Sequence, residues 1–362
     1  MDLKLGKVNI RLAKQEDNQA LLHLVNSVSM GEKFEIIFKR DPNFFYACQT
    51  QGFLCQTAVA EMEDKTLVAS CSRILKHAYI NGNPAVLGYI SDLRIVPSSK
   101  KMRILSNGSE FIKKLRDDNP AYIHLATITD DNRNAKIALT WKNKNSSIPN
   151  LYDLGTINTY FVFPLFKKRR KNKVAIQQGS LEILDDIVAF LNKEGCRKQF
   201  YPVYTKEYFL NLRDFHIENF CVAYNEENQI IGVAAKWEQT HFKQIFLKQY
   251  HGKMKWIQKI SCSLLPKEGE NIKYVYIAFI AVQNDDTEVL KNILLYMYPD
   301  MRKQKFKYFM IGFHENDPLN KALQPFYAIT YKSHLYAVEY KLDSEIKAML
   351  DYKTPYIEIA SL

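Results

Sequence analysis

The sequence predicts an α/β fold of the α+β kind, with helices packed on a mixed sheet and the chain divided into two tandem domains. Length is the first observation: 362 residues exceed one ordinary hydrophobic core and suit two domains of roughly 150–180 residues. Composition is the second, since 22 Tyr and 21 Phe favour strands over an all-helical chain. The third is element order, because a hairpin-rich start gives way to strand–helix–strand, which favours a mixed sheet over a doubly wound parallel one.

The first half opens on a strand over 8–12, where apolar and polar residues alternate. Residues 14–18 then precede apolar positions at helical spacing over 20–28, which predicts an amphipathic helix. A second helical segment is predicted over 34–38. The residues 40–42 after it, Arg-Asp-Pro, signal a turn or the start of a helix.

Hairpins follow this helical region. Glu63-Asp64-Lys65 is short and charged, as hairpin loops tend to be. Asn81-Gly82 is a strong turn signal, because both residue types tolerate the positive φ of a tight hairpin turn. We therefore expect three strands, over 56–62, 67–78 and 85–96.

The first half then changes to strand–helix alternation. Leu105, Ile112 and Leu115 lie on one side of a predicted helix. The expected elements are this helix over 103–115, a strand over 123–128, a helix over 134–141 and further strand near 160–163.

The second half repeats this order in looser form, which indicates a duplication. Pro299 is expected to end its long helix. The expected elements are a helix over 181–191, a hairpin of strands 220–224 and 230–237, a strand over 273–282, a helix over 287–298, a strand over 308–313, a short helix over 319–326 and a strand over 333–342.

The chain is basic, with a formal net charge of +11. Much of the excess lies in the run KKRRKNK at 167–173, where a linker is expected. We interpret the run as a solvated linker; an arm that binds tRNA or other RNA is the alternative, although the run holds no aromatic residue for stacking on bases. The predicted organisation is an N-terminal domain over 1–165, a basic linker over 166–178 and a C-terminal domain over 179–362.

The six cysteines form no C-x-x-C pair and no spacing typical of a zinc site, so we expect reduced thiols and no metal. No apolar run reaches the roughly 18 residues of a membrane span, and the N-terminus lacks an apolar signal core. We therefore expect a soluble, cytoplasmic protein.

The segment from Gly88 to Leu105 reads GYISDLRIVPSSKKMRIL. It resembles the core of the GNAT superfamily of acyl-CoA-dependent N-acetyltransferases, in which a strand ending L-x-V-x-P leads through a glycine-rich loop into a helix. Asp131-Asn132-Arg133-Asn134-Ala135 resembles the N-x-x-A start of a later helix in that family. The resemblance implies two tandem GNAT-like domains, the first of which holds an acyl-CoA site.

In such a site, the strand's end parts from its neighbour and offers backbone groups to the cofactor. The helix N-terminus that follows binds the pyrophosphate through free N–H groups and the positive end of its dipole. Two positions that are glycine in the family are Arg103 and Leu105 here, and their side chains obstruct that approach, although Lys101 keeps positive charge nearby. The resemblance assigns cofactor binding to Leu93, Arg94, Ile95, Lys101, Met102, Arg103, Ile104, Leu105, Ser106, Asn132 and Asn134.

The resemblance also implies two catalytic groups. Asp92 is the carboxylate best placed to act as general base on the incoming amine, although an aspartate there also serves to hydrogen-bond a loop. The family often places a tyrosine, as general acid, four residues beyond the alanine; that position is Leu139. The acid is therefore absent, or another hydroxyl, such as that of Tyr89 or Tyr122, does its work; we assign the role to Tyr89.

The expected function is transfer of an acetyl or other acyl group from acetyl-CoA or another acyl-CoA to the primary amine of a small molecule or peptide. The alternative is a GNAT-fold module that binds or regulates without catalysis, which the residues Arg103, Leu105 and Leu139 favour. The second half holds an acidic loop without glycine at 281–287, so we expect it not to bind CoA.

Overall fold

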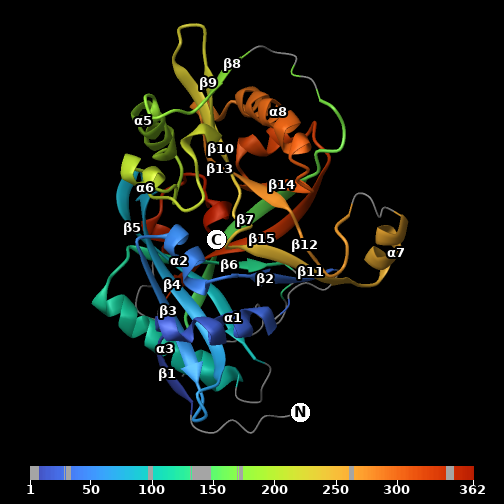
Figure 1. Cartoon of the computed structure of the whole chain (residues 1–362). Helices are drawn as coiled ribbons and strands as arrows, with labels where there is room; N and C mark the ends of the chain where they lie inside the picture. The colour runs from blue at the N-terminus through green and yellow to red at the C-terminus, as the bar shows by residue number, and fades with distance from the viewer. Residues whose placement is uncertain are drawn as a thin grey trace.

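One twelve-stranded sheet runs through both halves of the chain in the part that the structure describes (Figure 1). The computed structural model describes residues 8–27, 29, 34–96, 101–130, 132, 148–168, 170, 174–260, 265–339 and 346–362. The strand order is β1-β3-β4-β5-β6-β15-β7-β14-β13-β10-β9-β8. The predicted mixed α/β architecture is confirmed.

The N-terminal half supplies one end of the sheet. Asn81 and Gly82 have φ angles of 55° and 84°, as a two-residue hairpin turn between β4 and β5 requires. These strands are β1 (Asn9–Leu12), β3 (Leu54–Glu61), β4 (Leu67–Ile80), β5 (Asn83–Ile95) and β6 (Ile123–Thr129).

The C-terminal half supplies the other end, and its hairpin of β9 and β10 has the bounds that the sequence predicted. These strands are β8 (Ala175–Gln178), β9 (Phe220–Tyr224), β10 (Ile230–Trp237), β13 (Tyr274–Val282) and β14 (Tyr308–His314).

The two halves exchange strands at the middle of the sheet. Strand β15 (Ala328–Glu339), late in the chain, pairs with β6 of the first half. Strand β7 (Asn150–Val162), from the first half, pairs with both β15 and β14. Each half therefore completes its part of the sheet with a strand of the other, and the sheet is continuous.

A second, three-stranded sheet also joins the halves. Its members are β2 (Phe34–Lys39), β11 (Gln244–Tyr250) and β12 (Glu270–Asn271). The prediction of a helical segment over 34–38 is wrong, because β2 pairs antiparallel with β11. A short apolar run does not distinguish strand from helix without its distant partner.

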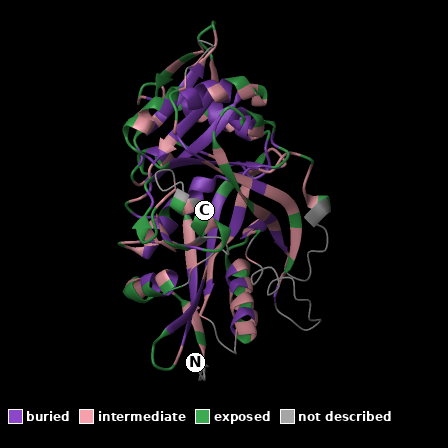
Figure 2. Ribbon diagram, turned by 90° about the vertical axis from the view of Figure 1, so that its right-hand side faces the viewer, coloured by how far each residue is buried: buried purple, intermediate pink, exposed green. Residues whose placement is uncertain are grey.

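Helices cover both faces of the large sheet. In the N-terminal half α1 and α2 lie on one face and α3 on the other, and in the C-terminal half α5 and α8 lie on opposite faces. Figure 2 shows the buried residues gathered along the sheet between these helices. The helices are α1 (Asn18–Ser27), α2 (Phe44–Gln51), α3 (Lys101–Asp118), α5 (Leu184–Gly195), α6 (Lys206–Leu210), α7 (Lys253–Ile260), α8 (Thr287–Lys303) and α9 (Ile346–Met349).

Helix α8 runs through Pro299, so the prediction that this proline ends the helix is wrong. Tyr298 and Met301 on either side are buried in the core. This tertiary packing outweighs the loss of one backbone hydrogen bond at the proline. None of the described helices is long and apolar enough to cross a membrane.

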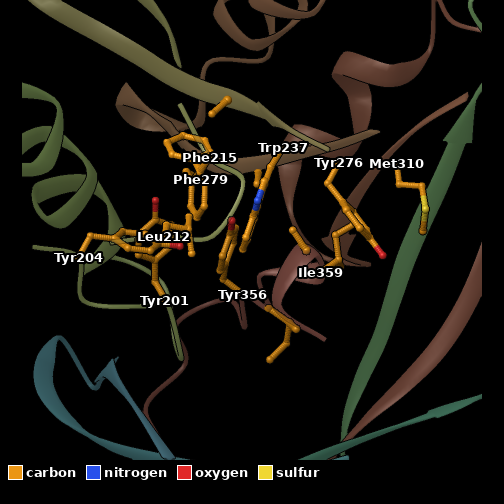
Figure 3. Close-up of a cluster of buried hydrophobic side chains, with 14 of the residues drawn as sticks. Tyr201, Tyr204, Leu212, Phe215, Trp237, Tyr276, Phe279, Met310, Tyr356 and Ile359 are labelled. Carbon is orange, nitrogen blue, oxygen red and sulfur yellow. The ribbon is translucent and has the colours of Figure 1, made fainter. Parts of the chain in front are cut away.

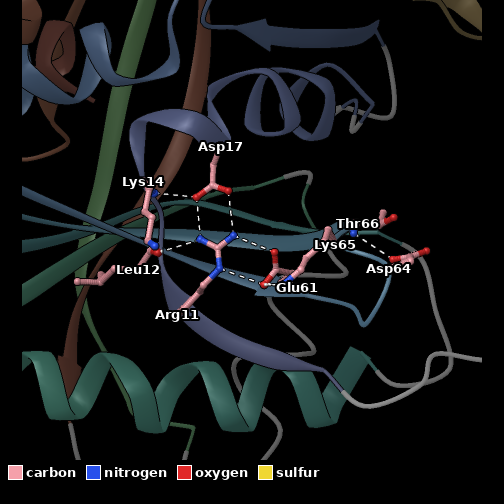
Figure 4. A network of polar contacts seen from close by, with 8 residues as sticks. All are labelled: Arg11, Leu12, Lys14, Asp17, Glu61, Asp64, Lys65 and Thr66. Carbon is pink, nitrogen blue, oxygen red and sulfur yellow. Dashed lines mark hydrogen bonds and ion pairs between the residues drawn. The ribbon is translucent and has the colours of Figure 1, made fainter.

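A guanidinium ties the edge strand β1 to the body of the N-terminal half (Figure 4). Arg11 donates to Asp17 at 2.7 Å and to Glu61 of β3 at 3.0 Å. Hydrogen bonds from Arg11 hold the pKa of both carboxyls below their ordinary values. The edge strand that lies beside α3 is thereby held in register.

Replacing Gly108, inside α3, with alanine is expected to raise the free energy of unfolding by about 0.5–1 kcal/mol, because glycine is a poor helix former. A methyl group at Gly108 meets nothing within 4 Å. Urea denaturation measures the change. The control is Gly88→Ala, whose methyl group would lie 2.2 Å from the His124 ring and should destabilise. A loss of stability in Gly108→Ala would contradict the packing described here.

Candidate functional site

Strands β5 and β6 part from each other in the middle of the N-terminal half. They pair in parallel only from Leu87 to Ile90, opposite Ile123 to Ala126. Beyond these pairs β5 continues to Ile95 and β6 to Thr129 without pairing to each other. The parted strand edge that the sequence predicted beside residue 95 is present.

A β-bulge lies at the same place. Ser70 of β4 is opposite Arg94, whereas Ser72 is opposite Ser91, so β5 holds one extra residue. Asp92, in the bulge, has a φ of 48°. A bulge of this kind turns backbone groups out of the ladder, where they can meet a ligand.

The C-terminal half repeats both features. Val233 of β10 is opposite Ala281 and Ala235 is opposite Ala278, so β13 holds one extra residue around Phe279, whose φ is 55°. The parallel pairing of β13 with β14 begins at Tyr274 and ends at Tyr276. Phe279 is therefore the structural equivalent of Asp92, and the duplication inferred from element order has a matching detail in the backbone.

We call the gap beside each bulge, where the parallel strands part, a slot. In the C-terminal half the slot is filled by the chain itself. Glu358 accepts a hydrogen bond from the bulge N–H of Phe279 at 2.8 Å. Ile359 packs against Gly312 of β14, where a methyl group would lie 2.5 Å from its Cγ2 atom. Figure 3 shows Tyr356 and Ile359 among the rings around Phe279. The segment 355–362 thus occupies the place that a ligand would take, which gives a second reason, beside the acidic loop, to look for the cofactor in the first half.

In the N-terminal half the slot opens into a cavity of about 100 Å³ between the sheet and α3. Its walls are almost wholly apolar. Both sides of the parted edge contribute to them, Ile90, Leu93 and Ile95 from β5 and Ala126 from β6, together with Ile104 and Leu105 from α3. Ser70 donates to the Asp92 carbonyl of the bulge at 3.2 Å.

The predicted cofactor residues separate into groups. Leu93, Ile95, Ile104 and Leu105 line the cavity. Arg94 points to the other face of the sheet. Lys101, Met102, Arg103 and Ser106 lie in the first turns of α3, with Arg103 exposed. Asn132 follows β6, and its N–H donates to Thr129 O at 3.1 Å. Asn134 lies outside the described residues.

The two positions that lack the family's glycine differ in their consequences. Leu105 is buried, packs against Ile148 and contributes to the cavity wall. Arg103 is exposed on α3. Its guanidinium and the ammonium of Lys101 add positive charge to the N-terminal end of a helix whose dipole already favours anions.

A charged cluster lies behind the bulge, on the face away from α3. Arg40 donates to Asp92 Oδ1 at 3.2 Å, and Arg94 Nη2 lies 3.9 Å from the same oxygen. Burial opposes ionisation of Asp92, but the positive charges of Arg40 and Arg94 outweigh it and lower the pKa of Asp92 below its ordinary value. A carboxylate held in this way is a weak base. These ion pairs count against a role of Asp92 as general base, and that role stays a prediction.

Tyr89 lies on the same face as Asp92. Its hydroxyl shares a hydrogen bond of 2.5 Å with Thr127 Oγ1, just beyond the last paired residues of β5 and β6. Burial raises the pKa of Tyr89 well above its ordinary value. The hydroxyl therefore keeps its proton firmly, and its role as general acid also stays a prediction.

Three further charged residues beside this cluster were missed by sequence reasoning. They are Arg40, Lys243 and Glu358, each buried. Lys243 Nζ donates to Leu362 O at 2.5 Å and to Ala360 O at 3.1 Å. No local motif marks them, because their partners are 52 to 119 positions away in the chain.

Lys76→Met is expected to stabilise the protein at pH 7 by up to about 3 kcal/mol. Burial lowers the pKa of Lys76 to about 8 from 10.5, so the folded state releases this proton while the unfolded state still binds it. The free-energy cost of burying the charged Lys76 ammonium is full below pH 8. It disappears as the pH rises to 10.5, at about 1.4 kcal/mol per pH unit. Stability of the wild type should rise over this interval and that of the variant should not. Urea titrations at pH 7 and 10 measure the difference, with the exposed Lys65→Met as control. Destabilisation at pH 7 would show that the contact of Lys76 with the Tyr89 ring outweighs the cost of burial.

Comparison with solved structures identifies the fold. The structure of Saccharomyces cerevisiae N-myristoyltransferase with bound myristoyl-CoA is similar with a TM-score of 0.60 and 12% identity, over 93% of this chain and 84% of that one. A GCN5-related glucosamine N-acetyltransferase region of a fungal multi-domain β-N-acetylglucosaminidase has a TM-score of 0.66 and 12% identity, over 92% of this chain and 38% of that one.

A GCN5-related N-acetyltransferase from Anabaena variabilis is also similar, with a TM-score of 0.51 and 8% identity over 91% of this chain and 72% of that one. No family model matches the sequence, and no curated protein does. The fold is therefore what the solved structures share with this chain: it has the mixed α/β architecture of two tandem GNAT-like units that N-myristoyltransferase also adopts.

Proposed function

We propose that the chain is an acyl-CoA-dependent N-acyltransferase that uses the parted edge of β5 and β6 as its active site. The observation that carries the proposal is the coincidence of three features in one place: the bulge at Asp92, the parted strands beyond Ile90 and the apolar cavity under α3. The similar structures include an N-myristoyltransferase with bound myristoyl-CoA, which supports an acyl-CoA as co-substrate.

In this proposal the acyl-CoA arm lies in the cavity, and the thioester carbonyl accepts hydrogen bonds from backbone N–H groups at the bulge. Preorganised donors there would stabilise the oxyanion that develops as an amine attacks. The bond from nitrogen to the acyl carbon forms and the carbon–sulfur bond breaks. The proton lost by the amine goes to the leaving thiolate, and no covalent enzyme intermediate is needed.

The CoA phosphates would lie at the N-terminal end of α3. Lys101 begins this helix and Arg103 follows within its first turn, so side-chain charge replaces part of what glycines supply to the close backbone approach elsewhere. The cavity walls suit an aliphatic acyl group, because they carry no charge.

The basic run at 167–173 supports the alternative of RNA binding less than the parted edge supports acyl transfer. Lys168 donates to Pro325 O at 2.6 Å, and the guanidinium carbon of Arg170 lies 5.8 Å from the centre of the Tyr296 ring. These described residues pack onto the C-terminal half. Residues 169 and 171–173 lie outside the described part of the chain.

The proposal is tested by measuring CoA release from acetyl-CoA and from a longer acyl-CoA with a panel of primary amines, alongside thermal unfolding with and without each acyl-CoA. We expect acyl-CoA to raise the melting temperature, since a ligand at 100 times its Kd stabilises the native state by about 2.7 kcal/mol, and amines to accelerate CoA release. Stabilisation without release would favour a non-catalytic binding module. If millimolar acyl-CoA causes neither stabilisation nor CoA release, the proposal is overturned.

A further inference from the structure

Two buried guanidiniums share a single carboxylate oxygen behind the bulge. Arg40 and Arg94 are 6% and 8% exposed. Their nearest contacts with Asp92 both involve Oδ1, at 3.2 and 3.9 Å. One carboxylate therefore serves two cations, and a buried charge without a full partner is costly.

The two other charged residues beside the cluster, Lys243 and Glu358, have partners of their own. Burial and repulsion from Arg40 lower the pKa of Lys243, from the turn before β11, well below its ordinary value, and its Nζ donates to Ala360 O and Leu362 O. The oxygens of Glu358 accept from Phe279 N, Tyr356 OH and Ala360 N. Neither residue therefore supplies a further acceptor for Arg40 or Arg94 among the described contacts.

Arg94 has a buried donor that no described group accepts. Its Nε is buried and has no hydrogen-bond partner, and Nη1 reaches the adjacent Leu93 carbonyl at 3.1 Å. Burial, together with repulsion from Arg40, outweighs the attraction of Asp92 and lowers the pKa of Arg94. A planar guanidinium with an unused N–H is suited to an oxyanion ligand, because carboxylates and phosphates accept two parallel hydrogen bonds from it.

The position of Arg94 relates this cluster to the proposed reaction. Leu93 and Ile95 line the cavity under α3, and side chains alternate along a strand, so Arg94 lies on the opposite face. In the proposed function, an amine that reached the bulge from this face would come next to Arg94 and Arg40, with the thioester arm on the other face.

We propose that the acceptor amine carries an anionic group, a carboxylate or phosphate a few bonds from the nitrogen, and that Arg94 and Arg40 bind it. This inference rests on the proposed function. The anion takes no part in the chemistry: acyl transfer to the nitrogen and protonation of the thiolate leave it unchanged. Its role is to place the amine at the bulge and to accept the unused N–H of Arg94.

The test compares acceptors that differ only in the anion: α-amino acids, their carboxamides and their phosphonate analogues, assayed for CoA release with the full chain. We expect the acids or the phosphonates to exceed the amides in kcat/KM by on the order of tenfold or more, and the two anionic series to tell a carboxylate from a phosphate ligand. Arg94→Gln should reduce this preference to about twofold or less, mainly by raising the acceptor's KM, and Arg94→Lys should restore part of it. The control is Arg197→Gln, which removes an exposed arginine that pairs with the buried Glu194 of α5 and should leave the preference intact.

Equal use of acids and amides by the wild type would overturn the inference and leave the proposed function standing. If no amine releases CoA, the proposed function fails, and thermal unfolding with the same compounds decides the inference separately. Anionic compounds should then raise the melting temperature of the wild type and of Arg197→Gln. Arg40→Gln is the second variant, to be used if Arg94→Gln does not fold, and its melting temperature should not respond. No shift, or an equal shift with the amides, would overturn the inference.

Discussion

Ala126→Phe is expected to weaken acyl-CoA binding by a factor of 100 or more. Ala126 is the last residue of β6 that pairs with β5, and it lines the cavity under α3. An aromatic ring at this position would fill the space that the acyl-CoA arm requires. A hundredfold loss corresponds to about 2.7 kcal/mol of binding free energy, and calorimetric titration with acyl-CoA measures it.

The matched control for this variant is Gly108→Ala, which adds a methyl group to the same cavity wall without a close contact. It should bind acyl-CoA within about threefold of the wild type. Filling a packed region costs about 1–3 kcal/mol of stability, so the melting temperature of Ala126→Phe is measured beside its affinity. A folded Ala126→Phe that binds acyl-CoA as tightly as the wild type would place the acyl-CoA arm elsewhere.

Glu358→Ala is expected to lower the free energy of unfolding by about 3–5 kcal/mol, the second large effect. Its carboxylate accepts from Phe279 N at 2.8 Å, Tyr356 OH at 2.9 Å and Ala360 N at 3.2 Å, all buried. Each buried donor left without an acceptor costs about 1–3 kcal/mol, and the missing side chain also leaves a cavity. With a total stability of about 5–15 kcal/mol for a typical domain, this loss is readily measured by urea denaturation.

Glu227→Ala provides the comparison, since Glu227 is an exposed glutamate in the loop between β9 and β10. That variant should stay within about 0.5 kcal/mol of the wild type. If Glu358→Ala is no less stable than Glu227→Ala, the segment 355–362 does not hold the second slot closed.

Local patterns predicted the elements whose partners are close in sequence. The β9–β10 hairpin was placed residue for residue, and the turn at Asn81-Gly82 gave the β4–β5 pairing, because alternation and turn chemistry act over a few residues. The parted edge beside Ile95 was also predicted, from the resemblance of its strand–loop–helix segment.

Features that depend on distant partners were missed. Strand β2 is a strand because β11, some 200 positions later, pairs with it. The exchange of β7 and β15 leaves no signal in either strand alone. The cluster of Arg40, Asp92 and Arg94 forms because the turn after β2 lies behind the bulge, and neither burial nor charge balance is visible in the sequence.

The domain boundary at residues 166–178 stays a prediction. The strand exchange means that the sheet does not divide there, because β7 precedes this segment in the chain yet pairs with β14 after it. The sheet has two equivalent bulges, one of them closed by Glu358, as the predicted duplication would produce.

A crystal structure with a bound acyl-CoA tests the central claim most directly. The proposal expects the thioester carbonyl at the backbone of Asp92 and Leu93, the acyl group in the cavity beneath α3, and the pyrophosphate at the α3 end that begins with Lys101. Density for the cofactor at the bulge of Phe279, with the segment 355–362 displaced, would contradict the account.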